Sequence, residues 1–240
     1  GLETSMFDLT PGQQATQAIA RDVAAAVEPL ADEADEYTTM HPGVLEILKD
    51  SGLTRHVVTA EYGGATGELE PLTIAIVREA LMYSSAHLDS MFGMQGVGSY
   101  SLSAGGSDEL KSIWLPRVAS LDAIADLALT EPDVGSDLRA VTTTIASDGV
   151  DLVVNGRKSF ITNGGAADFY CVLAKEGDGY SMVLVTADAP GLSIEKGADL
   201  MAPHILGELT FDGVRVPSSQ RLGTPGKAFS LMLQTLAVFR

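Results

Sequence analysis

The chain has 240 residues, 45% of them hydrophobic, so it can bury a sizeable core in one large domain or two ordinary ones. Its formal net charge of −17 at pH 7 argues against a nucleic-acid or anionic-membrane partner, because phosphate surfaces are bound by clustered Lys and Arg. No apolar segment approaches the ~20 residues of a membrane helix, and the first residues carry no secretion signal, so we expect a cytoplasmic protein without a membrane partner.

Up to about residue 122 the chain carries helix signals, which start with Thr10-Pro11-Gly12-Gln13. These residues offer an N-cap, a proline at the first helical position and a capping-box glutamine. Ile19, Val23 and Val27 then recur every four residues and predict one apolar helix face.

Further helices are predicted between turn signals. One begins with His41-Pro42 and ends near Gly52, one runs from Glu70-Pro71 through Leu81, and two span 90–103 and 108–116. The glycines of 61–67 predict a loop. Residues 1–122 are therefore expected to form an all-α N-terminal domain.

Beyond about residue 122 the hydrophobic period becomes that of strands. Ser147-Asp148-Gly149 and Asn155-Gly156 predict turns between short Val-rich runs. Further strands are predicted over 169–174, 181–186, 192–196 and 208–216. This spacing is typical of a sandwich or barrel, so we expect a middle β domain over residues 123–224. Its strand 169–174 holds the chain's single cysteine, Cys171, which we interpret as a core residue in a reducing compartment.

The helical pattern returns from residue 226 with Phe229, Leu233, Leu236 and Val238. Residues 225–240 are expected to be the beginning of a truncated C-terminal helical domain. The predicted fold class is α+β, with an N-terminal all-α helical domain, a β-barrel or sandwich middle domain and only the start of a C-terminal helical bundle.

Common hydrolytic, zinc-binding and nucleotide motifs are missing from the sequence. The glycines of Gly93-Met-Gln-Gly96-Val-Gly98 have the wrong order for a dinucleotide fingerprint, and they follow a predicted helix. The histidines are scattered along the sequence, at His41, His56, His87 and His204. We therefore predict no metal site.

The strongest functional signal lies in two segments, Leu127–Asp137 (LALTEPDVGSD) and Arg157–Gly165 (RKSFITNGG). Both place small and hydroxyl residues at predicted strand ends, where a ring system and a pyrophosphate could lie against exposed backbone. This pattern indicates a cofactor site.

These segments resemble the acyl-CoA dehydrogenase family. The matching motifs are Leu129-Thr-Glu-Pro-x-x-Gly-Ser-Asp137, Asn155-Gly-x-Lys158, Phe160-Ile-Thr-Asn163, Phe211-x-x-Val-x-Val-Pro217 and Gly226-x-x-Phe229 to Arg240. They occur in the family's order, and the resemblance covers essentially the whole chain, most strongly from Leu127 onward.

The resemblance implies non-covalently bound FAD and assigns its contacts. Leu129 and Thr130 match residues at the flavin pyrimidine edge, and Gly135 and Ser136 match the pyrophosphate contact. Phe160 matches an aromatic residue that packs on the ring system, and Thr162 matches a hydroxyl near flavin N5. Ser136 and Arg240 match positions that contact substrate.

The reaction that the resemblance implies is α,β-dehydrogenation of an acyl thioester, with an electron-accepting flavoprotein as partner and a homo- or hetero-oligomeric whole protein. The family's base is usually a C-terminal glutamate beyond Arg240, so the catalytic base is unknown and this chain alone is expected to be inactive. Glu131 could be proposed as a substitute base, but a capping or turn role is preferred for it.

Three alternatives remain: a dehydrogenase of carrier-protein-bound acyl groups, a flavin oxidase, and a non-catalytic subunit of a heteromeric dehydrogenase. The stretch 198–206 and the short loop 175–180 depart from the family pattern, which leaves the carrier open between coenzyme A (CoA) and a carrier protein. An acidic carrier protein would need a basic patch here. Its candidate members are Arg139, Arg157, Lys158, Arg215 and Arg221.

Overall fold

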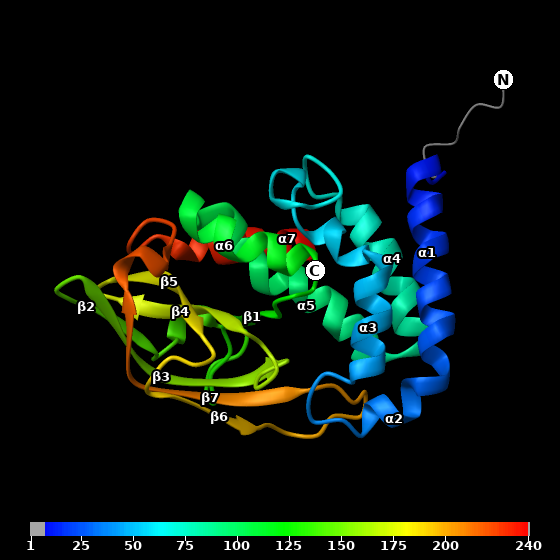
Figure 1. Ribbon diagram of the computed structural model, residues 1–240. Coiled ribbons are helices and arrows are strands. Elements are labelled where there is room, and N and C mark those ends of the chain that lie inside the picture. Colours follow the sequence, from blue (N-terminus) through cyan, green and yellow to red (C-terminus); the bar gives the residue numbers. More distant parts are fainter. Residues whose placement is uncertain (1–7, 240) are drawn as a thin grey trace.

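The computed structural model describes residues 8–239, in which a helical half and a sheet half lie side by side (Figure 1). The helices are α1 (Pro11–Val27), α2 (Ala31–Asp35), α3 (Pro42–Ser51), α4 (Pro71–Ser84), α5 (Ala86–Gly105), α6 (Asp108–Ala119) and α7 (Ala228–Phe239). The strands are β1 (Ala125–Ala128), β2 (Thr144–Asp148), β3 (Asp151–Thr162), β4 (Phe169–Glu176), β5 (Gly179–Thr186), β6 (Leu192–Lys196), β7 (Leu206–Pro217) and β8 (Arg221–Leu222). This order confirms the α+β prediction of a helical part, a β part and a final helix.

The first helix begins where the sequence predicts. Thr10 Oγ1 accepts from Gln13 N at 3.2 Å, and the Gln13 side chain accepts from Thr10 N at 3.0 Å, which completes the capping box. Val23 and Val27 are buried as expected, but the prediction was wrong for Ile19, which is 44% exposed. Eight residues rotate a helix position by about 80° relative to its starting direction, so Ile19 turns away from the face that packs on α4.

Two helices are longer than predicted. α5 begins at Ala86 because Ser85 Oγ accepts from Leu88 N and caps it. α6 continues past Pro116, where the prediction ended it, to Ala119. A proline removes one N–H, but its carbonyl still accepts, and Pro116 O receives a hydrogen bond from Ser120 N.

The strands form one eight-stranded mixed sheet. Its order is β6-β7-β3-β2-β4-β5-β8, with β1 added through β4. β1 and β2 run parallel to β4, whereas the other pairs are antiparallel. The chain turns between β2 and β3 at residues 149–150, next to the predicted turn Ser147-Asp148-Gly149, whose first two residues still pair within the sheet.

The prediction of a turn at Asn155-Gly156 was wrong, because β3 runs straight through these residues. It pairs with β2 on one side and β7 on the other, with a shift of register at this point. Gly156 has φ 147°, and a Cβ there would lie 2.4 Å from Thr143 Oγ1. The glycine therefore allows a β-bulge beneath a crossing segment, and Asn155 instead accepts from Gly213 N in a different turn.

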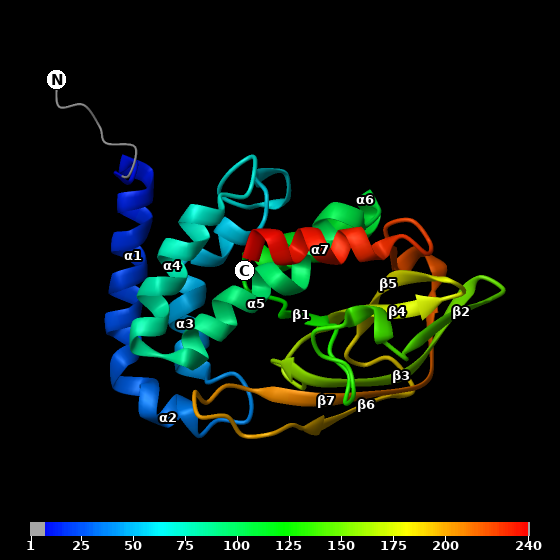
Figure 2. The ribbon, with the colours of Figure 1, turned by 180° about the vertical axis from the view of Figure 1, so that it is seen from behind.

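The helical half rests on the sheet through α5. A Cβ at Gly98 would lie 2.4 Å from Asp126 N, so α5 contacts the β1 backbone directly. α7 lies along α5 (Figure 2) and is joined to it by the buried pair Ser101 Oγ and Thr235 Oγ1, 3.1 Å apart. This packing brings α7 to the same side of the sheet as the end of β1.

Candidate functional site

A cleft of about 640 Å³ lies between residues 129–139 and α7. Its sheet side holds four residues assigned to the cofactor from the sequence: Leu129, Thr130, Gly135 and Ser136. Its opposite wall is apolar and comes from Phe229, Met232, Leu233 and Leu236 of α7. Hydroxyl groups and backbone facing an apolar wall suit a ligand with a polar rim and an apolar body.

The packing of the protein itself does not require a glycine at position 135, so Gly135 needs another explanation. A Cβ at this position would meet no protein atom within 4 Å, and Gly135 is not among the glycines with positive φ. Open space over its backbone is what a closely bound ligand needs. This observation fits a diphosphate or similar group at Gly135 and Ser136.

The second predicted segment lies directly against the first. Ser159 N donates to Thr130 O at 2.9 Å, although the two residues belong to different segments. Phe160 follows with φ 56° and is 55% exposed. A left-handed φ is costly for an aromatic residue and persists where surrounding structure imposes it. Here Phe160 N donates to Glu208 Oε1, which helps to hold the backbone in place.

One predicted site residue among those described stands apart from this cleft. Thr162 is partly exposed at the end of β3, opposite Leu206 of β7, and it is not among the residues that line the cleft. Arg240 lies outside the described residues. The fold thus brings four predicted cofactor residues into one cleft and places Phe160 beside it.

Glu131 and Lys158 form a buried ion pair under the cleft. Their Oε1 and Nζ atoms are 3.0 Å apart, and Lys158 Nζ also donates to Leu129 O at 2.8 Å. Glu131 further accepts from both the N–H and the hydroxyl of Thr142 and from Thr143 N. Every lone pair that could take a proton is occupied, which supports the structural role preferred for Glu131 and argues against a base.

Burial and partners oppose each other in this pair. Burial alone would raise the pKa of Glu131, but hydrogen bonds from Thr143 and Thr142 and the charge of Lys158 outweigh it and lower the pKa. Burial lowers the pKa of Lys158, against the raising effect of Glu131. The structural role of Lys158 was not predicted from the sequence. Its signal was the strand alternation that buries Leu152 and Val154 and carries Lys158 to the same side.

A second buried carboxyl group lies in β1, three positions before Leu129, the first residue of the cleft in the sequence. Asp126 is fully buried, and its Oδ1 accepts from Leu127 N at 2.7 Å, whereas Oδ2 has no hydrogen-bond partner among the described residues. Burial raises the pKa of Asp126 well above its usual range, which favours the neutral acid. Nearby Cys171 is fully buried, as predicted, and burial also raises the pKa of its thiol.

The five cations considered for a basic patch do not converge. Lys158 is committed to Glu131, Arg215 contacts Asp148 and Asp151, and Arg221 contacts Glu176. Arg139 and Arg157 have no ion pair with any described residue. Of these two, only Arg139 lines the cleft.

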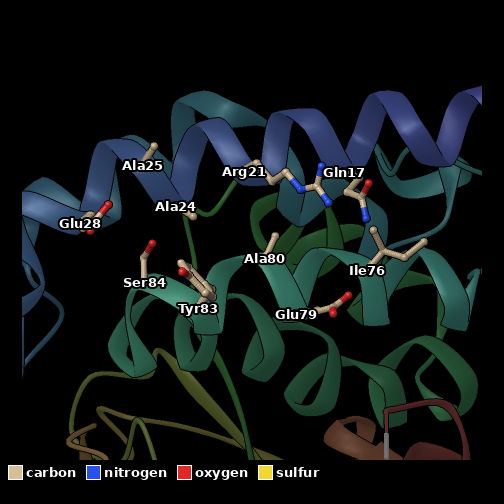
Figure 3. A pocket seen from close by; sticks show the side chains of 10 residues that line it. All are labelled: Gln17, Arg21, Ala24, Ala25, Glu28, Ile76, Glu79, Ala80, Tyr83 and Ser84. Carbon is tan, nitrogen blue, oxygen red and sulfur yellow. The ribbon is translucent and has the colours of Figure 1, made fainter.

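A separate groove of about 400 Å³ lies between α1 and α4 (Figure 3). Arg21 of α1, Glu28 directly after α1 and Glu79 of α4 are among its lining residues, over a floor that includes Ala24 and Ala80. It contains none of the residues predicted for the site. α1 forms the edge of the molecule farthest from the sheet (Figure 1), so this groove is remote from the cleft.

Two of the histidines, His41 and His87, lie side by side in the fold. His41 N donates to His87 Nε2 at 3.0 Å, while His41 Nδ1 accepts from Gly43 N and Val44 N and caps α3. Burial is the first cause that lowers the pKa of His87, to about 4. Residues 8–239 contain no group of three or more His, Cys, Asp or Glu side chains placed to hold a metal ion. Among the same residues, no helix combines the length and the apolar character that a bilayer span requires.

The chain matches two domain families along most of its length. The family described as acyl-CoA dehydrogenase, N-terminal domain, matches residues 10–122, and that described as acyl-CoA dehydrogenase, middle domain, matches residues 126–214. The chain therefore belongs to the acyl-CoA dehydrogenase family, which confirms the resemblance drawn from its motifs.

Individual relatives agree with this result. Cyclohexane-1-carbonyl-CoA dehydrogenase of Syntrophus aciditrophicus is 33% identical over an alignment of 234 residues that covers 94% of this chain and 60% of that protein. A solved glutaryl-coenzyme A dehydrogenase complex with glutaryl-CoA has a TM-score of 0.89 and 27% identity, covering 97% of this chain and 61% of that one. A glutaryl-CoA dehydrogenase from Mycobacterium smegmatis in complex with FADH2 has a TM-score of 0.85 and 29% identity, covering 95% and 59%. The chain thus spans about 60% of the length of these proteins.

Proposed function

We propose that this chain binds FAD in the cleft between residues 129–139 and α7, and that the whole protein performs α,β-dehydrogenation of an acyl thioester. The observation that carries the proposal is the meeting of Leu129, Thr130, Gly135 and Ser136 in one cleft. The open space over Gly135 and the exposed Phe160 ring beside the cleft add to it. The solved relative with FADH2 supports the choice of cofactor.

In this proposal each residue has a limited task. Thr130 and Ser136 supply hydroxyls to the polar edges of the cofactor, and Gly135 lets its diphosphate approach the backbone. Bound FAD supplies a hydride acceptor. The apolar side chains of α7 hold the acyl group and exclude water, which strengthens the hydrogen bonds that polarise a thioester carbonyl.

Removal of the α-proton requires a desolvated base that is free to accept it. Among the described residues that line the cleft, Asp137 is the one carboxylate, and it is exposed. Glu131 is fully occupied by hydrogen bonds. We therefore propose that the 240-residue chain alone has no turnover, and that the whole protein passes its electrons to an electron-accepting flavoprotein. Reduction of an electron acceptor by the purified chain with butyryl-CoA would contradict the first point.

The cofactor proposal is tested by adding FAD to the purified chain and measuring the retained absorbance near ~450 nm, a flavin signature. Thr130→Val and Ser136→Ala should each weaken retention about tenfold, since each removes one hydrogen bond to a polar ligand. Ser147→Ala, an exposed hydroxyl in β2, is the matched control and should bind as the unmodified chain does. Equal retention by all four proteins would reject the site.

A further inference from the structure

A β-bulge interrupts β3 where the strand reaches the cleft. The register of β3 against β7 shifts between Lys158 and Ile161. Between these two, Ser159 and Phe160 have only Glu208 of β7 opposite them. Two residues opposite one define a bulge, which disrupts the ladder of backbone hydrogen bonds and redirects side chains. The sheet therefore departs from regular pairing inside the second segment that the sequence singles out.

The side chain of Glu208 binds both residues of the bulge. Its Oε2 accepts from the Ser159 hydroxyl, and its Oε1 accepts from Phe160 N at 3.3 Å. Ser159 N is directed away from β7, since it donates to Thr130 O at 2.9 Å. Hydrogen bonds to an ionised carboxylate are stronger than neutral ones. One carboxylate thus replaces the bonds that the bulge takes from the ladder.

The bulge determines the side of the strand on which Phe160 lies. Alternate residues of a regular strand share a face, so Phe160 would lie on the side of Lys158, which is completely buried. Instead Lys158 and Ser159 are both buried, and Phe160 is exposed. Phe160 reaches this position with a φ of 56°, which an aromatic residue keeps only where its surroundings impose it. The two hydrogen bonds to Glu208 supply that constraint.

Glu208 stands on a rigid part of β7. Leu209 beside it is completely buried, and a Cβ at Gly207 would lie 2.7 Å from Gly164 Cα. The backbone of β7 is therefore in close contact with the chain just beyond β3. Glu208 is itself partly buried. A side chain on such a support can hold a neighbouring group in one orientation before a ligand arrives.

We propose that Glu208 is a positioning residue, whose carboxylate fixes the bulge and so directs the Phe160 ring to the cofactor cleft. This inference rests on the proposed function. A ring already held in its binding orientation loses little freedom when a flat ligand packs on it, so pre-organisation improves affinity. The role depends on hydrogen bonds and not on charge. Glu208→Gln should therefore preserve it, since an amide accepts from Phe160 N and donates to Ser159 Oγ.

The first test measures FAD binding by the purified chain, through the retained absorbance at ~450 nm and the visible circular dichroism of the bound flavin. Glu208→Ala and Phe160→Ala should each weaken binding about tenfold. The double variant should bind no more weakly than either one, because both changes remove the same contact. Glu208→Gln should bind as the unmodified chain does. The matched control is Glu195→Ala, which removes the exposed carboxylate opposite Glu208 in β6 and should leave binding unchanged.

The second test needs no cofactor. Trp114, the single tryptophan, is changed to Phe, and Phe160→Trp then places a lone indole at the bulge. Acrylamide should quench its fluorescence strongly, because position 160 is exposed. Adding Glu208→Ala should weaken the quenching, since a relaxed strand turns residue 160 toward the buried side of Lys158. Adding Glu208→Gln should leave it unchanged.

The outcomes separate the inference from the function beneath it. If Glu208→Ala retains FAD fully and leaves the quenching unchanged, the inference is wrong while the proposed function stands. If the unmodified chain binds no FAD, the proposed function falls, and the quenching alone decides whether Glu208 sets the bulge.

The remaining outcomes concern how Glu208 acts. If Glu208→Gln weakens binding as much as Glu208→Ala, the carboxylate acts through its charge and the positioning role is overturned. If the two single losses add in the double variant, Glu208 does not act through Phe160 and the inference is wrong. Should Glu208→Ala fail to fold, Ser159→Ala takes its place in both tests, because it removes one of the two bonds to the carboxylate.

Discussion

The Nζ atom of Lys158 lies 3.0 Å from Oε1 of Glu131, with both side chains almost completely buried. This pair links the segment that begins with Leu129 to β3, because the same ammonium group donates to Leu129 O. The buried ion pair therefore fixes the position of the Leu129 segment, which forms the sheet side of the cleft. Two opposite charges removed from water depend on each other far more than a surface pair does.

Replacing one member of this pair should destabilise the protein strongly. Lys158→Met leaves the Glu131 charge buried without its cation, and we expect the free energy of unfolding to fall by about 3–5 kcal/mol. Urea unfolding followed by circular dichroism measures this loss. The control is Lys196→Met, whose partner Asp199 is 84% exposed, and its cost should stay below about 1 kcal/mol. Similar costs for both variants would contradict the role given to the pair.

The lowered pKa of Glu131 makes a prediction about acid stability. The folded state holds this carboxyl below its ordinary pKa of 4.5, so the unfolded state binds the proton more readily. The contribution to stability is complete above pH 4.5 and is lost as the pH falls toward the folded pKa. Urea unfolding of the unmodified chain between pH 2 and 6 should therefore depend on pH more steeply than that of Glu131→Gln. Parallel pH profiles would refute this.

Asp126 should have the opposite effect. Its folded pKa is raised by burial, so the folded state binds the proton more readily and stability falls as the pH rises above about 4. Asp126→Asn removes this titration, and we expect it to gain on the order of 1–3 kcal/mol at pH 7. The gain should shrink toward pH 4. Asp212→Asn, at an exposed position in β7, should change stability by no more than about 0.5 kcal/mol.

Substitutions at two glycines should distinguish an effect on folding stability from an effect on FAD binding. Gly156→Ala would place a Cβ 2.4 Å from Thr143 Oγ1 at a φ of 147°, so the melting temperature should fall by several degrees, as expected for a loss of about 1–3 kcal/mol. Gly135→Ala meets no protein atom within 4 Å and should melt with the unmodified chain while retaining less FAD. A Gly135→Ala protein that melts early, or that retains flavin fully, would count against an open cradle at this position.

Much of the fold was predictable because its signals are local. A capping box at Thr10 and Gln13 closes within one turn of helix, and Gly52 ends α3 with a left-handed φ of 70°. The strands predicted over 169–174, 181–186 and 192–196 lie within β4, β5 and β6. The turn predicted at Asn155-Gly156 does not form, because the pairing of β3 with strands on both sides outweighs the turn preference of two residues.

The sequence by itself determined the family and the order of helical and β parts, because each depends on neighbouring residues or on motif order. The same motifs predict the residues proposed for the cofactor site. Tertiary structure alone decided that Glu131 is held by Lys158, 27 positions away, and that Arg139 meets Tyr180, 41 positions away. The electrostatic state of a side chain depends on which groups the completed sheet and helices bring within a few ångströms. No periodicity along the chain encodes that choice of partner.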